Sequence, residues 1–122
     1  MSKKIFVNLQ VKDLKKSIEF FSQLGFKFSK QFTDEKGSCM IIGEDILVML
    51  LVEDFFKNFT KKAISDSVVN TEVIVTLSAE SKEEVDKLTN RALNAGAISS
   101  GENQDYGWMY GRGFEDLDGH LW

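Results

Sequence analysis

With 122 residues, the chain is long enough for one domain with a single hydrophobic core. Its formal net charge of -4 and its pI of about 5.0 argue against nucleic acid or an anionic membrane as the main partner. No apolar stretch approaches the roughly 20 residues that span a bilayer, and the first residues show no signal-peptide pattern. The single cysteine, Cys39, excludes an internal disulfide and suits a reducing compartment, so we expect a cytoplasmic location.

The first part of the sequence predicts a strand, a helix and three further strands. Residues 5–11 alternate between two faces with period two, which is typical of a half-buried strand. Asp13 occupies the N-cap position of the following helix, and Gly25 ends it because glycine adopts left-handed geometry without strain. The three further strands are predicted at 26–32, 38–42 and 46–52.

The same order then begins again after a connecting segment. Residues 53–70 break the strand pattern, and their phenylalanines favour a short amphipathic helix. A strand is predicted at 72–77, and a helix follows it with a capping box at Ser81 and Glu84. Gly96 ends this helix as Gly25 ends the first. The last paired strands are predicted at 108–116 and 120–122.

This repeated order indicates a duplicated module within a single domain, 1–122. We predict module one at about 1–52, a connector at about 53–70 and module two at about 71–122. Each half-sheet would need the other half to bury its inner face. The last strand is short, so we also expect the natural chain to continue past Trp122.

Two stretches resemble a known family. Residues 11–26 (VKDLKKSIEFFSQLGF) and residues 114–120 (FEDLDGH) resemble the opening and the closing turn of the glyoxalase / bleomycin resistance protein / dioxygenase (vicinal oxygen chelate) superfamily. Leu117 stands where that turn usually has proline. The resemblance implies an α+β fold in which two βαβββ modules form a curled eight-stranded mixed sheet around a cavity. It marks the fold well and the activity poorly.

Enzymes of this superfamily hold a divalent metal in the cavity through four side chains, mostly His, Glu or Gln. The resemblance places the first three ligand positions at Phe6, near Met49 and near Ile74, and the fourth one residue beyond Trp122. Phenylalanine, methionine and isoleucine offer neither oxygen nor imidazole to a hard divalent ion. We therefore predict no metal site and no cofactor.

A row of large side chains alternates along the predicted strand at 108–116. If this row faces the cavity, it offers stacking surfaces and one cation to an anionic or aromatic ligand. The equally weighted alternative is that it packs on a helix or on a second subunit. Asn8 shares a face with Phe6 and should point into the cavity. The predicted ligand-binding residues are therefore Phe6, Asn8, Met49, Ile74, Trp108, Tyr110 and Arg112.

Other polar residues favour structural roles. His120 is the only histidine, but it directly follows the turn at 116–119, where a polar residue commonly satisfies backbone groups. Asp116 and Asp118 lie in the same turn, where aspartate is favoured for backbone hydrogen bonding. Glu72 is predicted to be exposed to solvent. Cys39 lies in an apolar run and is predicted to be a buried, inert thiol.

Three functions remain open at this point. The favoured one is a metal-free protein that binds a small amphipathic or aromatic molecule in the cavity, as a homodimer. The first alternative is a metal-dependent lyase, isomerase or dioxygenase of the glyoxalase type with unrecognised ligands. The second alternative is a non-catalytic interaction domain whose cavity is packed core. Neither nucleic acid nor a membrane is expected as a partner.

Overall fold

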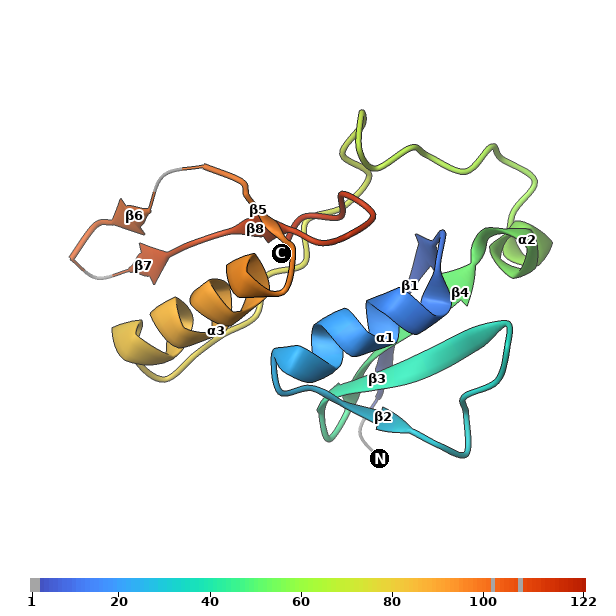
Figure 1. Cartoon of the computed structure of the whole chain (residues 1–122), viewed down its shortest axis with the longest axis horizontal. Helices are drawn as coiled ribbons and strands as arrows, with labels where there is room; N and C mark the ends of the chain where they lie inside the picture. The colour runs from blue at the N-terminus through green and yellow to red at the C-terminus, as the bar shows by residue number, and fades with distance from the viewer. Residues whose placement is uncertain (1–2, 102, 108) are drawn as a thin grey trace. The chain divides into compact units, whose positions relative to one another are not determined.

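The computed structural model describes residues 3–101, 103–107 and 109–122 (Figure 1). The chain forms two compact units, Met1–Ile64 and Ser65–Trp122, which are called here the first and the second unit. The predicted connector at 53–70 is therefore divided between them. No helix in the described part of the chain has the length and apolarity needed to cross a membrane.

The first unit is an α+β arrangement in which a helix packs on a four-stranded mixed sheet. Strand β1 pairs in parallel with β4, whereas β3 pairs antiparallel with both β4 and β2. The order across the sheet is therefore β1-β4-β3-β2. The elements, in chain order, are β1 (Ile5–Val11), α1 (Leu14–Gln23), β2 (Lys27–Ser29), β3 (Gly37–Gly43), β4 (Ile46–Val52), α2 (Glu53–Phe56) and the 3-10 helix η1 (Lys57–Phe59).

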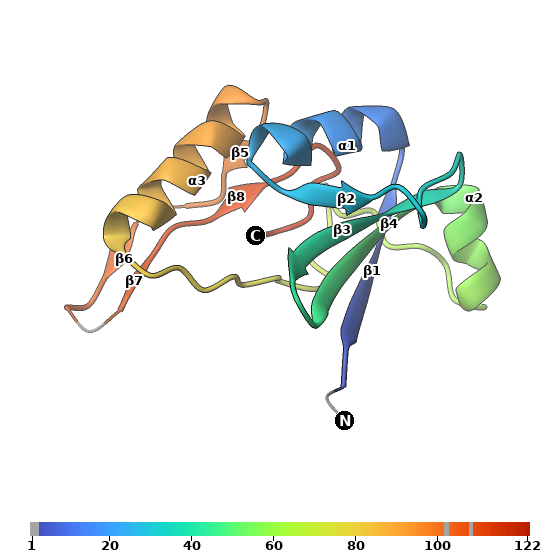
Figure 2. The same ribbon diagram turned by 90° about the horizontal axis from the view of Figure 1, so that it is seen from below.

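Helix α1 covers one face of this sheet (Figure 2). It begins where the sequence predicts, because the Asp13 side chain accepts a hydrogen bond from the backbone N–H of Lys16 at 3.1 Å. Phe20 and Phe21 are both 1% exposed and pack edge to face, with ring centroids 4.9 Å apart. They belong to the core of the unit together with buried residues of the sheet, which include Leu9, Met40, Val48 and Leu50.

Strand β2 is shorter than the predicted 26–32. It ends at Ser29, whose carbonyl accepts a hydrogen bond from the Thr33 hydroxyl at 2.5 Å. The Asp34 carboxylate then accepts hydrogen bonds from the backbone N–H groups of Lys36 and Gly37, at 2.8 and 3.2 Å. Side chains of the turn thus bind backbone groups that a longer ladder would have paired.

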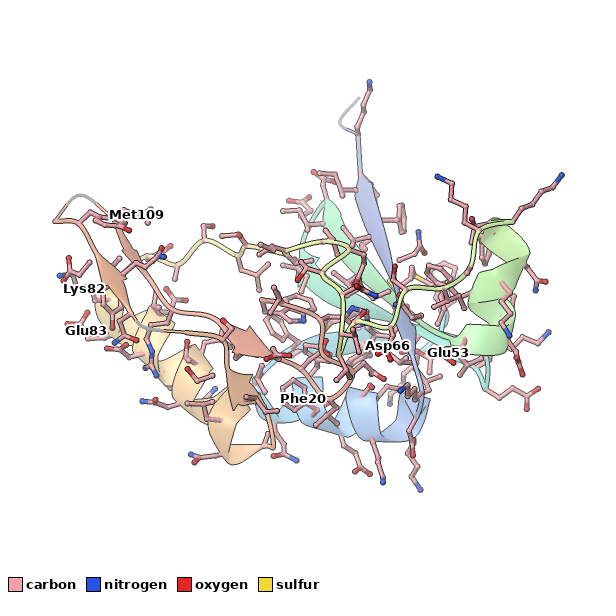
Figure 3. The ribbon with its side chains drawn as sticks, turned by 90° about the horizontal axis from the view of Figure 1, so that it is seen from above. Phe20, Glu53, Asp66, Lys82, Glu83 and Met109 are labelled. Atoms are coloured by element: carbon pink, nitrogen blue, oxygen red, sulfur yellow. The ribbon has the colours of Figure 1, made fainter. Side chains whose placement is uncertain are left out.

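In its described residues, the second unit contains one long helix, α3 (Lys82–Asn94), and four short strands. The Ser81 side chain accepts a hydrogen bond from the backbone N–H of Glu84, as the capping box predicts, and Gly96 lies beyond the helix with a φ of +114°. Figure 3 shows Lys82 at the start of this helix. The strands are β5 (Ile98–Ser99), β6 (Gln104–Asp105), β7 (Tyr110–Gly111) and β8 (Phe114–Glu115).

Several predicted strands of module two are wrong in extent. Within the predicted 72–77 only Ile74 forms a bridge, and within 120–122 only Leu121 does. The predicted 108–116 contains two short strands, β7 and β8, and in the break between them a Cβ at Gly113 would stand 3.1 Å from the Trp122 carbonyl. The described residues form sheets of four, two and two strands, not the predicted single curled sheet of eight strands.

The ladder of the second unit nevertheless repeats the order of the first. Ile74 pairs in parallel with Leu121, Leu121 pairs antiparallel with Glu115 of β8, and β8 pairs antiparallel with β5. This sequence of partners corresponds to β1-β4-β3-β2 of the first unit. The pair β6–β7 continues the β5–β8 hairpin past an irregularity in the register, at the position of the shorter β2–β3 connection.

Candidate functional site

The strand register of the first unit brings together three of the predicted ligand-binding residues. Phe6 lies opposite Leu47, and Asn8 lies opposite Met49, in the parallel pair of β1 and β4. Residues that are direct partners across a ladder point to the same face of the sheet. We call this side of the sheet, opposite α1, the open face; its side chains at the centre are those of Phe6, Asn8, Cys39, Ile41, Leu47 and Met49.

Burial differs between the two faces of this sheet, but it also falls toward the start of β1 and β4, where Ile5 and Ile46 on the α1 side are 57% and 44% exposed. On the side of α1, Leu9, Val48 and Leu50 are at most 1% exposed. On the open face, Phe6 is 53% exposed and Ile41 is 40% exposed. Contiguous exposed apolar patches on folded proteins often correspond to interaction surfaces. The Asn8 side chain is exposed and has no hydrogen-bonding partner among the described residues.

Cys39 belongs to the same face but is 3% exposed. Burial raises the pKa of its thiol above the ordinary value, so the thiolate that acts as a nucleophile is disfavoured. A buried thiol with a raised pKa agrees with the inert role predicted for Cys39.

In the second unit, Ile74 lies on the face that it shares with Leu121 and Glu115. The two bridges make Ile74 and Leu121, and then Leu121 and Glu115, direct partners. Ile74 is 62% exposed, whereas His120 and Trp122, which flank Leu121 on the opposite face, are 1% and 8% exposed. The second unit therefore repeats the pattern of one buried and one open side.

The large side chains of the 108–116 segment lie against α3, which is one of the two arrangements that the sequence left open. The Tyr110 hydroxyl donates to the Asp86 carboxylate at 2.6 Å. Arg112 Nη1 donates to the same carboxylate at 3.1 Å and to the Asn90 side chain at 3.2 Å. Phe114 is 4% exposed and belongs to the core. Trp108, the fourth member of the row, lies outside the described residues.

These contacts determine the electrostatics at the surface of α3. Hydrogen bonds from Tyr110 and then from Arg112 lower the pKa of Asp86, and the same bond to Asp86 raises the pKa of Tyr110. Lys82 contributes a second contact between α3 and the β6–β7 hairpin, since its ammonium lies 2.9 Å from the Asp105 carboxylate. Tyr110 and Arg112 thus have structural partners on α3, and their binding of a ligand stays a prediction.

A polar network connects the last turn to the start of the second module: Ser67 and His120 are buried, whereas the Glu72 side chain is 24% exposed. His120 Nδ1 lies 2.7 Å from the Glu72 carboxylate, whose other oxygen accepts a hydrogen bond from the Ser67 hydroxyl at 2.8 Å. Partial burial opposes ionisation of Glu72, but the hydrogen bonds from Ser67 and His120 together lower its pKa. The sequence suggested a structural role for His120 but did not reveal Glu72 as its partner, because 48 positions separate the two.

Asp116 organises the turn itself. Its Oδ1 accepts hydrogen bonds from the backbone N–H groups of Asp118 and His120, at 2.9 and 3.0 Å, and its Oδ2 accepts one from the Trp122 indole at 2.9 Å. Asp116 is 6% exposed, and this burial raises the pKa of its carboxyl despite the three donors. The backbone role predicted for Asp116 is confirmed by these contacts.

The side chains present do not fit the metal site of the superfamily that the sequence resembles. Phe6, Met49 and Ile74 carry no oxygen or nitrogen donor, and hard divalent ions require such donors. Among residues 3–101, 103–107 and 109–122, no three His, Cys, Asp or Glu side chains gather closely enough to hold a metal ion. No chemical step through a metal follows from these residues.

Comparison with known proteins assigns the family. The sequence profile of the Glyoxalase/Bleomycin resistance protein/Dioxygenase superfamily matches residues 5–122. The chain belongs to this superfamily. No curated protein matches the sequence.

Solved structures of similar fold include one of closer sequence. The hypothetical protein SA1046 from S. aureus is 33% identical to this superfamily member, with a TM-score of 0.82 over 99% of this chain and 91% of that one. A glyoxalase/bleomycin resistance protein/dioxygenase family enzyme from Burkholderia phytofirmans PsJN is 16% identical, with a TM-score of 0.79 over 98% and 94%. The fosfomycin resistance protein FosX from Listeria monocytogenes is 21% identical, with a TM-score of 0.70 over 99% and 89%. The last two likenesses show the fold alone.

Proposed function

We propose that this superfamily member binds a small amphipathic or aromatic molecule on the open face of its first module, without a metal ion. The observation that carries the proposal is the strand register, which gathers Phe6, Leu47 and Met49 around the Asn8 amide. Ligand sites typically combine an apolar lining with a few polar groups that orient the ligand. Asn8 supplies one donor and one acceptor for that purpose.

The apolar character of the face sets the ligand class. Phe6 offers an aromatic ring with half of its surface exposed, and Ile41 and Met49 extend the apolar area beside it. A flat aromatic body would cover this surface, and a carbonyl or amine on that body would bind Asn8. No described carboxylate or imidazole belongs to the set that defines the face, which disfavours acid–base catalysis there.

Binding without a metal is tested first, by elemental analysis of the purified protein with and without added nickel, zinc, iron or manganese. The proposal expects well below one metal ion per chain under every condition. About one tightly held ion per chain would refute it and would favour a glyoxalase-type lyase, isomerase or dioxygenase.

The site is tested by screening small aromatic compounds for stabilisation of the protein and then titrating the best compound against variants. We expect Phe6→Ser to weaken binding about 4- to 12-fold, because full burial of an aromatic side chain contributes about 1.5–3 kcal/mol and Phe6 has 53% of its surface still exposed. Asn8→Leu should weaken only ligands that carry a hydrogen-bonding group. Phe32→Ser is the matched control, because Phe32 is 61% exposed and is not a member of the open face. Equal affinity for Phe6→Ser and the wild type would exclude this face as the site.

A homodimer and a cytoplasmic location also stay predictions. Light scattering on the purified chain at several concentrations tests the first. If a second copy covers the open face, Phe6→Ser should shift the protein toward the monomer, whereas a small-molecule site alone predicts no such shift.

A further inference from the structure

One row of side chains on the open face crosses all four strands of the first unit. Phe6 on β1 is the ladder partner of Leu47 on β4. Leu47 also pairs with Ile41 on β3, and Ile41 pairs with Lys27 on β2. Because direct partners point to the same face of a sheet, Lys27 lies on the open face and not on the side of α1. Three apolar side chains and one ammonium group therefore share this row.

The geometry of the row determines the shape of a ligand that covers it. Phe6, Ile41 and Lys27 are exposed, and Leu47 is half-buried. Adjacent strands lie about 4.8 Å apart, so the apolar part from Phe6 to Ile41 spans about 10 Å, and Lys27 begins one strand further. Strands β1 and β2 are the two edges of the sheet. A ligand on this row is therefore elongated, with one end at the β1 edge and the other at the β2 edge.

The charges around the row determine the direction of the ligand. The four strands of the first unit contain no aspartate or glutamate, and Lys27 is their only charged residue. Within the described residues, its ammonium group has no ion-pair or hydrogen-bonding partner. Glu44 and Asp45 lie in the turn that joins the two central strands, β3 and β4. An acidic group on the ligand is therefore favoured at the β2 edge and disfavoured near the centre of the sheet.

We propose that the ligand of the open face is an elongated amphipathic anion, with its apolar body across Phe6, Leu47 and Ile41 and its acidic group at Lys27. This inference rests on the proposed function and adds the charge of the ligand and the direction in which it lies. One exposed ion pair contributes little, so the apolar row supplies most of the affinity and Lys27 determines the preference for a charged ligand over a neutral one.

A lysine on an edge strand has a competing role, which is to prevent the strand from pairing with another chain. That role predicts increased self-association, and no change in ligand affinity, when Lys27 is replaced. Light scattering on the same variants measures self-association, so the two roles are distinguished in one set of samples.

The experiment uses two probes with the same elongated aromatic skeleton. The anionic probe, 6-(p-toluidino)naphthalene-2-sulfonate, carries a sulfonate at one end, and the neutral probe, N-(p-tolyl)-2-naphthylamine, lacks it. Binding is followed by fluorescence on the whole chain, after circular dichroism has shown that each variant keeps the wild-type fold. Lys27→Gln should raise the Kd of the anionic probe about 2- to 5-fold, as expected for one exposed ion pair, and leave the neutral probe unchanged. The effect should shrink at about 0.5 M salt, which screens exposed charges.

Lys30 provides the matched control. It is also exposed, but it follows the end of β2 and lines the surface next to α1. Lys30→Gln removes the same charge from the chain and should change the Kd of neither probe. Lys27→Arg keeps the charge on the open face and should keep the preference for the anionic probe.

Phe6→Ser separates the failure of this inference from the failure of the proposed function. If Phe6→Ser weakens both probes but Lys27→Gln changes neither, or weakens both equally, the ligand lies on the open face and only the inference is overturned. If Phe6→Ser changes neither probe, the proposed function fails with it. Equal effects of Lys27→Gln and Lys30→Gln on the anionic probe, or an anionic probe that responds to Lys27→Gln and not to Phe6→Ser, would also overturn the inference.

Discussion

Replacing Asp116 measures how much the last turn contributes to the stability of the second unit. The carboxylate accepts three hydrogen bonds, from two backbone N–H groups and the Trp122 indole. Each such bond contributes about 0.5–1.5 kcal/mol net, and a buried donor left without a partner costs more. Asp116→Ala should therefore lower the free energy of unfolding by about 2–4 kcal/mol. Urea denaturation followed by circular dichroism, with the slope checked for constancy, gives this number.

Asp116→Asn is the matched variant. Its amide oxygen can still accept both backbone hydrogen bonds, while its NH2 group faces the indole N–H, so the loss should be about 1 kcal/mol. If Asn costs as much as Ala, or if Ala costs under about 0.5 kcal/mol, the three-bond account of the turn is wrong.

The pH dependence gives an independent check. Burial raises the pKa of Asp116 in the folded protein, so protonation of this carboxyl favours the folded state. This contribution to stability is fully present below the unfolded pKa, near 3.8, and is lost as pH rises through the folded pKa. The wild type should therefore gain stability relative to Asp116→Asn as the pH falls from 7 toward 4. A constant difference between the two proteins would contradict the raised pKa.

Three other predictions concern the same fold. The pKa of Glu72 is lowered in the folded protein, so its carboxylate stabilises the fold above the unfolded pKa, near 4.5, and this effect is lost as pH falls through the folded pKa. Glu72→Gln should therefore destabilise the protein at pH 6 and have a smaller effect below pH 4.5. A destabilisation that does not depend on pH would count against the His120 and Ser67 contacts. Gly37→Ala places a Cβ 2.7 Å from the Leu51 side chain and 3.0 Å from the Leu50 carbonyl, and should cost about 1–3 kcal/mol in urea denaturation, whereas Gly43→Ala meets nothing closer than 3.9 Å and should cost less. Phe20→Ala should cost about 3–5 kcal/mol against under about 0.5 for the exposed Phe32→Ala, and similar losses at both positions would refute the assignment of the core under α1.

The sequence was sufficient for the parts of the fold that local chemistry determines. Asp13 and Ser81 begin their helices because a side-chain oxygen caps the first turn, and this signal lies within four residues. Gly25 and Gly96 follow the helices with φ values of +102° and +114°, which only glycine adopts easily. The opening family signature, 11–26, contains Asp13 and Gly25, and the closing one, 114–120, contains the turn that Asp116 organises.

The strands of the second module were harder to predict because tertiary pairing determines their length. Residues 72–77 alternate like a strand, but only Ile74 finds a ladder partner. Strands β5 and β6 were missed, since two-residue strands leave almost no periodic pattern. Likewise, no spacing rule joins Glu72 to His120 or Tyr110 to Asp86, which lie 48 and 24 positions apart.

In the candidate site, too, the sequence predicts what is local to one strand and not what depends on pairing between distant segments. That Phe6 and Asn8 share a face follows from period two along one strand, but their approach to Met49 depends on the parallel register of β1 and β4. The side on which Tyr110 and Arg112 lie was open in the sequence, and it is determined by the acceptors that α3 provides.

The position of β6 and β7 has a consequence for how this chain can change over evolutionary time. They form the distal end of the hairpin whose base is β5 and β8, and their contacts with α3 run through Lys82 and Asp86. The base is the part that pairs onward through Glu115 to Leu121 and Ile74. We therefore expect the distal end to tolerate changes of length and sequence between related proteins better than the base, on which the duplicated order of strands rests.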